Sequence, residues 1–287
     1  MKNIKSLLLL FCAILFFSCS SEDNEPTIQE FEEPSIAEIV NADGTKYTAH
    51  EGYISYRSKD GTTLKRIDFE YPDHIEIDLG YGDKGTIDYF CGGFRDFENK
   101  IILIFYPLCY QYEILNQTSA FVFMSDKDLN HISKKEIQSF NYIYFENELM
   151  LSLRIGGTYA LYDKDINEIL QGKTDKSMSW VGDFWGLARI GQYYYLAVNA
   201  GFESMFSPHA IINLNTGSVS ELERISDEDI IKDHFAAETN PPRRGSSSYE
   251  LIPGENGYLN VTLNFTLYNG SKKEVNYKYD VNGKVIR

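Results

Sequence analysis

Short hydrophobic runs, separated by clusters of Asp, Asn and Gly, dominate the chain from Lys46 onward. The runs are rich in Tyr, Phe, Ile, Val and Thr, a composition that favours strands joined by turns. The most apolar run, Ile101 to Cys109, predicts a strand that is buried on both faces. The clearest runs span residues 52–56, 75–79, 86–90, 101–106, 120–124, 142–145, 149–155, 158–162, 193–198, 210–214, 258–267 and 274–281.

A turn phrase recurs along these strands. Asp126-Lys-Asp-Leu-Asn130 and Asp163-Lys-Asp-Ile-Asn167 each follow a hydrophobic run, and they begin 37 residues apart. Related phrases lie at 212–217 and 279–283, and a second series of turn residues precedes the runs that begin near 101, 149, 193 and 258. The second series advances by 48, 45 and 64 residues, irregular steps that lie near the repeat of a four-stranded propeller blade. We therefore predict an all-β fold, a degenerate β-propeller of about five blades over residues 46–287, with a two-sheet β-sandwich as the alternative.

Two short helices are predicted between the strands. Ser133 to Glu136 has the spacing of a capping box, and Ser226 to Asp229 is a weaker version that opens a helix ending near Ala237. The segment Arg243 to Ser248 predicts an exposed loop, because it combines charged residues with Gly and Ser.

The first 18 residues have the layout of a secretory signal peptide. Lys2 and Lys5 precede an uninterrupted apolar run from Leu7 to Phe17. This run is too short to span a bilayer comfortably. The segment 1–18 is therefore predicted to be removed on export.

The residues at the end of this segment carry a resemblance to a known class of protein. Phe16-Phe17-Ser18-Cys19 resembles the lipobox of bacterial lipoproteins, which implies that Cys19 is acylated and becomes the N-terminus. The following residues Glu22, Asp23 and Glu25 resemble the acidic export signal of Bacteroidota-type lipoproteins. The resemblance implies a lipid-anchored outer-membrane protein at the cell surface, with the periplasmic face as the alternative. It covers only the N-terminus and assigns no family to the body of the chain.

The charge balance limits the partners of this protein. The chain has 42 Asp plus Glu against 27 Lys plus Arg, a net charge of −15, which argues against binding to nucleic acid. Residues 19–45 contain many Asp and Glu residues and no Lys or Arg. This composition predicts an extended tether that joins the lipid anchor to a single domain at 46–287.

Several residues are candidates for a site. Trp180, Trp185 and Tyr194 lie in an aromatic-rich segment that predicts either a ligand platform or the core of one blade.

Cys91 and Cys109 flank a predicted hairpin and form either a disulfide or two buried thiols. Asp126, Asp128 and Asn130 have the first three ligand spacings of a calcium loop. The loop is one residue short, lacks the glycine of the sharp bend and follows a strand, so Asx turns between strands are the preferred interpretation and calcium is the alternative.

No motif of an enzyme stands out, and no cofactor is implied. Gly80-Tyr-Gly-Asp-Lys-Gly85 matches a dinucleotide fingerprint, but a strand follows it where a helix is needed, so it predicts a glycine-rich hairpin. The sequence favours a non-enzymatic envelope lipoprotein that binds a glycan, a nutrient or a protein partner. The alternatives are a subunit of an envelope complex or an immunity protein that neutralises a toxin, and, third, a hydrolase.

Overall fold

The computed structural model describes residues 34–72, 74–80, 83–107, 118–178, 183–199, 209–238, 240 and 242–286. Ser35–Arg287 forms one compact unit, separate from Met1–Pro34. The predicted signal peptide, Cys19, the three acids at 22, 23 and 25, Cys109 and Trp180 lie outside the described residues. No helix in the described ranges is long and apolar enough to cross a membrane.

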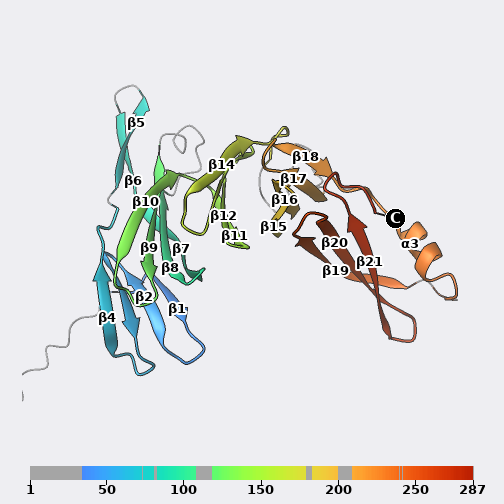
Figure 1. Ribbon diagram of the computed structural model, residues 1–287, viewed down its shortest axis with the longest axis horizontal. Coiled ribbons are helices and arrows are strands. Elements are labelled where there is room, and N and C mark those ends of the chain that lie inside the picture. The colour runs from blue at the N-terminus through green and yellow to red at the C-terminus, as the bar shows by residue number, and fades with distance from the viewer. Residues whose placement is uncertain are drawn as a thin grey trace, which may run out of the picture. The chain divides into compact units, whose positions relative to one another are not determined.

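The strands follow one another along the chain and pair with their sequence neighbours in antiparallel sheets (Figure 1). Sheet 1 contains β1 (Ala37–Val40), β2 (Lys46–His50), β3 (Tyr53–Arg57) and β4 (Thr63–Asp68). Sheet 2 contains β7 (Tyr89–Phe97), β8 (Lys100–Pro107), β9 (Ser119–Asp126) and β10 (Ile132–Gln138). A separate hairpin, β5 (Ile75–Gly80) and β6 (Asp83–Ile87), lies between these sheets in the sequence.

Three more sheets complete the series. Sheet 3 contains β11 (Tyr142–Glu146), β12 (Leu149–Leu153), β13 (Thr158–Tyr162) and β14 (Glu168–Lys173). Sheet 4 contains β15 (Phe184–Ile190), β16 (Tyr193–Asn199), β17 (His209–Asn213) and β18 (Ser218–Glu221). Sheet 5 contains β19 (Arg243–Ile252), β20 (Tyr258–Thr266) and β21 (Lys272–Tyr279). Consecutive up-and-down sheets of this kind are the repeating unit of a propeller, so the prediction of an all-β, propeller-like fold is confirmed.

Each sheet packs its apolar face against the next sheet in the chain. Leu103 and Phe105 of β8 pack against Tyr47 and Ile54 of sheet 1, whereas their neighbour Ile104 faces sheet 3. Successive residues of a strand point to opposite faces of the sheet. A sheet that lies between two others therefore needs apolar residues at the odd-numbered and at the even-numbered positions of its strands. The sandwich alternative is wrong, because a sandwich buries only one face of each sheet while β8 and β12 are buried on both.

The strands that the pattern missed are mostly edge strands of the sheets. β4 and β14 alternate between exposed and half-buried positions, and β10 and β18 are short of apolar residues. Such strands show little hydrophobic signal because each has a neighbouring strand on one side only. Their position in the sheet, rather than their composition, specifies them.

Three local predictions were wrong for the same reason. Ser133 to Glu136 lies within β10, whose residues pair with β9 in unbroken register from Ile132 to Gln138. Arg243 to Ser248 belongs to β19 and pairs with β20 across one bulge. The tether was predicted to reach residue 45, yet β1 at Ala37–Val40 pairs with β2. In each case hydrogen bonds to a neighbouring strand outweigh a local preference of about 1 kcal/mol.

The second predicted helix is present as α3 (Asp227–His234). Ser226 caps it, since its hydroxyl accepts a hydrogen bond of 3.1 Å from the Asp229 amide. Ile230 is fully buried and, with Phe235, joins the apolar cluster between sheets 4 and 5. The helix therefore covers one end of that interface.

The recurring phrases form equivalent turns in successive sheets. Asp126 to Asn130 joins the third and fourth strands of sheet 2, and Asp163 to Asn167 does so in sheet 3. The Asp163 carboxylate accepts hydrogen bonds of 2.8 Å from the amides of Asp165 and Asn167, which is an Asx turn. The predicted repeat is thus a repeat of turn geometry.

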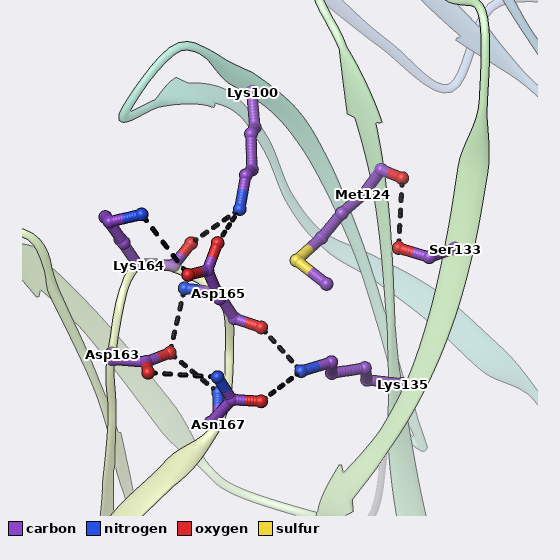
Figure 2. A network of polar contacts seen from close by, with 8 residues as sticks. All are labelled: Lys100, Met124, Ser133, Lys135, Asp163, Lys164, Asp165 and Asn167. Atoms are coloured by element: carbon purple, nitrogen blue, oxygen red, sulfur yellow. Dashed lines mark hydrogen bonds and ion pairs between the residues drawn. The ribbon is translucent and has the colours of Figure 1, made fainter.

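These turns also connect one sheet to the next. Figure 2 shows that Lys100 of β8 pairs with the Asp165 carboxylate. Lys135 of β10 donates bonds of 2.6 Å to the Asp165 carbonyl and the Asn167 side chain. Elsewhere the Tyr47 hydroxyl donates to the Lys127 carbonyl and the Tyr159 hydroxyl to the Leu214 carbonyl, both at 2.7 Å. A turn of one sheet is therefore held by side chains of the sheet before it.

We expect Asp163→Ala to lower the free energy of unfolding by about 1–3 kcal/mol, because it leaves turn amides without their acceptor and loosens the attachment to Lys135. Urea denaturation would measure this loss. Asp128→Ala is the matched control, since Asp128 is exposed and accepts no hydrogen bond within the described residues, and it should change stability by less than about 0.5 kcal/mol. Equal effects of the two variants would contradict the assigned role of the turn.

Candidate functional site

A cavity of about 330 Å³ lies between sheets 4 and 5 beside α3. Sheet 4 contributes His209 at the start of β17, and sheet 5 contributes alternate residues of its three strands. The segment that leads from β18 to α3 closes another side. The lining residues are His209, Glu221, Leu222, Glu223, Arg224, Ile225, Ile230, Arg244, Tyr249, Val261, Leu263, Tyr277 and Tyr279.

The register of sheet 5 explains why these residues converge. Tyr249 of β19 pairs with Val261 of β20, and Val261 pairs with Tyr277 of β21. Directly paired residues lie on the same face of a sheet. The face that packs against sheet 4 therefore carries apolar residues in its centre and tyrosines beside them.

An aromatic group supports the wall of the cavity. The rings of Trp185 and Tyr249 are stacked with centroids 3.8 Å apart, and both contact His209 edge-on. Tyr249 Oη and His209 Nδ1 share a hydrogen bond of 2.9 Å. Because Trp185 covers one face of Tyr249, it fixes the orientation of both polar side chains from behind.

Charges of both signs surround the cavity. Arg244 forms an ion pair of 2.8 Å with Asp227 of α3, and Glu221 forms one of 2.7 Å with Lys176. Burial lowers the pKa of His209, and the positive charge of Arg244 lowers it further. Burial raises the pKa of Tyr279 to about 12. At neutral pH the cavity thus contains a neutral imidazole and neutral phenols between charged groups.

The hydroxyl group of Tyr277 is the most informative atom. It is buried and has no hydrogen-bond partner among the described residues, and burial raises its pKa. A buried polar group without a partner costs about 1–3 kcal/mol, so such groups usually have a reason. A ligand oxygen that accepted from this hydroxyl would recover the lost interaction.

The predicted aromatic platform is only partly present here. Trp185 lies behind the cavity wall and belongs to the cluster between sheets 4 and 5. Tyr194 packs on the opposite face of sheet 4, against the cluster between sheets 3 and 4, and lines a different cavity of about 400 Å³. The structure therefore separates Trp185 from Tyr194, and Trp180 lies outside the described residues.

The other predicted site residues lie far along the chain from this cavity. Asp126 accepts a 2.8 Å bond from the Asn130 amide in a turn of sheet 2, and Asp128 lies in the same turn. Within the described ranges no three His, Cys, Asp or Glu side chains are grouped to hold a metal ion. Cys91 lies on β7, and burial raises the pKa of its thiol. Its suggested partner Cys109 falls outside the description, so the disulfide stays a prediction.

Sequence reasoning missed most of the cavity. The run at 274–281 was predicted as a strand, but nothing local showed that His209 lies opposite its Tyr277 and Tyr279. Arg244 was assigned to a loop and not to a strand. Only the pairing of sheet 5 brings these residues together.

We expect stability to fall as pH decreases, in part through His209. Its pKa in the folded state lies below the ordinary value of 6.5, so the unfolded chain binds the proton more tightly. The contribution of His209 to the free energy of unfolding is complete above about pH 6.5 and is lost as the pH falls toward the pKa of the folded state. The total loss is about 1.4 kcal/mol for each unit by which the pKa values of the unfolded and folded states differ. Unfolding free energies at pH 7.5 and 5.5 should differ less in His209→Gln than in the wild type. His131→Gln, which replaces an exposed histidine outside this cavity, is the control for the substitution itself.

Comparison with known proteins gives no family. No protein-family model matches the chain, and no curated protein matches it significantly. Among solved structures, the complex of BBS1N with ARL6DN has 8% identity and a TM-score of 0.36, covering 89% of this chain and 70% of that chain. BamB from Moraxella catarrhalis has 9% identity and a TM-score of 0.24, covering 85% of this chain and 79% of its own. Such TM-scores are too low to identify a fold, so the propeller-like assignment rests on strand order and register.

Proposed function

We propose that this protein is a lipid-anchored lipoprotein of the outer membrane whose all-β domain binds a small, hydroxyl-rich ligand without chemical change. The ligand class is a glycan unit or a similar nutrient, and its site is the cavity between sheets 4 and 5. The anchor is Cys19, and Glu22, Asp23 and Glu25 direct the protein to the cell surface. Support for the anchor comes from the N-terminal sequence alone.

The observation that carries the binding site is the buried, unpartnered hydroxyl of Tyr277, a residue that lines a defined cavity. Around it the cavity offers donors and acceptors together, in the form of Arg224, Glu223 and the pair of His209 with Tyr249. A ligand with several hydroxyl groups both donates and accepts hydrogen bonds, so it can use such a mixed lining.

The apolar part of the lining fits the same class of ligand. Val261 and Leu263 of β20 form an apolar strip beside the tyrosine rings. Sugars present C–H faces as well as hydroxyl groups, and aromatic or aliphatic walls cover those faces. The volume lies at the lower end of the range of about 300–1,000 Å³ for small-molecule sites, which limits the ligand to one or two sugar-sized units.

The anchor can be tested directly in cells. We expect the N-terminal peptide of the mature wild-type protein to begin at an acylated Cys19, and Cys19→Ser to be released from the membrane fraction. Replacing Glu22, Asp23 and Glu25 by Ala should keep the acyl chains but protect the body from protease added to intact cells. Membrane attachment of the Cys19→Ser variant would refute the anchor. Protection of the wild-type body would instead place it on the periplasmic face.

The binding site predicts opposite effects of one substitution. Tyr277→Phe removes an unsatisfied buried hydroxyl, so the ligand-free protein should become more stable by about 1 kcal/mol. The same variant should bind its ligand about tenfold more weakly, because it loses a hydrogen bond worth about 1.4 kcal/mol. Thermal unfolding with and without a library of mono- and disaccharides measures both effects.

Tyr193→Phe serves as the control, because Tyr193 is an exposed tyrosine of β16 outside this cavity. It should change neither stability nor ligand binding. A saccharide that stabilises wild type and Tyr277→Phe equally would place the site elsewhere. A complete library without any stabilising compound would exclude the proposed ligand class.

A further inference from the structure

The hairpin of β20 and β21 presents a tyrosine at its tip. Tyr268 is 86% exposed, the highest value among the large hydrophobic side chains of the described residues. The turn that carries it is held by bonds from the Leu267 amide to the Ser271 carbonyl and from the Gly270 amide to the Leu267 carbonyl. The Asn269 side chain accepts two more bonds from Ser271, at 2.9 and 2.7 Å. The ring is therefore displayed on a well-defined turn.

Two cations lie next to this tip on one face of sheet 5. Arg243 of β19 pairs with Thr266 of β20, which pairs with Lys272 of β21. The three residues therefore form one row across the sheet, and both cations are exposed. Neither joins an ion pair within the described residues. We call Arg243, Tyr268 and Lys272 the tip patch.

Arg243 and Lys272 lie on the face of sheet 5 that is turned away from the cavity, and Tyr268 lies in the turn that follows β20. Arg244 and Phe265, the next residues of β19 and β20, belong to the face that packs toward sheet 4. Side chains alternate between faces along a strand, so Arg243 and Thr266 point the other way. One carboxylate, Glu274, follows Lys272 on the same face, where it pairs with Asn264. The tip patch therefore has an excess of positive charge.

This placement is unusual in a chain with a net charge of −15. Exposed cations in such a protein can pair with the abundant carboxylates, yet Arg243 and Lys272 remain available. A preorganised tyrosine is a frequent hot spot of protein interfaces because few rotamers are lost on binding. Neighbouring cations add attraction for an acidic surface and accelerate association with it.

We propose that the tip patch is a docking surface for an acidic face of a partner protein. Charge complementarity defines the partner, since Arg243 and Lys272 require carboxylates and Tyr268 requires a shallow apolar recess between them. This interaction is independent of the ligand cavity and goes beyond the proposed small-ligand function, so either can fail without the other.

Site-specific crosslinking in cells tests this surface. Tyr268 is replaced by the photoreactive p-benzoylphenylalanine in the full-length protein. We expect one discrete protein adduct whose crosslinked peptide lies within a cluster of Asp and Glu residues. The adduct should decrease at least fivefold in R243E/K272E and remain unchanged in Lys59→Glu, which reverses an exposed cation of the turn between β3 and β4. The purified partner should bind Tyr268→Ala more than tenfold more weakly and bind the wild type more weakly at high salt.

Several outcomes would overturn the proposal. These are the absence of an adduct above the level given by the same crosslinker at Tyr193, an adduct insensitive to R243E/K272E, and a crosslinked peptide without acidic residues. Binding of the purified protein to phosphatidylglycerol vesicles through the same residues, without a protein adduct, would identify a lipid surface instead. If R243E/K272E has a lower unfolding temperature than the wild type, the binding of the purified partner to Tyr268→Ala replaces it as the test, and unchanged binding would refute the proposal. An 86% exposed side chain contributes little to folding, so this variant should remain folded.

Discussion

The packing of each β-sheet against the next one in the chain is the constraint on which the rest of the structure depends. A sheet with neighbours on both faces needs apolar residues on both faces of its inner strands, and β8 and β12 meet that requirement. Adjacent residues such as Leu103 and Ile104 then belong to different interfaces. The order of sheets therefore follows the order of strands in the sequence.

The polar elements are arranged around this stack of apolar interfaces. The repeated Asp and Asn turns satisfy their own backbone amides and accept lysine or tyrosine donors from the preceding sheet. Such bonds add modest stability each, but they fix the relative position of two sheets that apolar contacts alone leave free to slide. Of the residues that resemble a calcium loop, Asp126 and Asn130 take part in such a turn.

The candidate site arises where the apolar interface between sheets 4 and 5 gives way to polar side chains. Tyr249 and His209 are held by Trp185, while Arg244 and Asp227 tie β19 to α3. A cavity with a buried, unpartnered hydroxyl has a stability cost that packing elsewhere must offset. The opposite face of sheet 5 carries the exposed cations Arg243 and Lys272, and the exposed Tyr268 lies in the turn between β20 and β21. One three-stranded sheet thus provides two chemically different surfaces.

The sequence by itself determined the strand content, most inner strands and the repeat, because burial on both faces demands apolar runs and tight turns demand Asp, Asn and Gly. It also determined α3 through the Ser226 cap. It did not determine β4, β10, β14 and β19, whose polar residues become strands only beside an existing neighbour. The tertiary structure alone decided that His209 and Tyr277, 68 residues apart, share a cavity and that Trp185 and Tyr194 do not. Register and sheet stacking set these distances, and neither is encoded in any single segment of the chain.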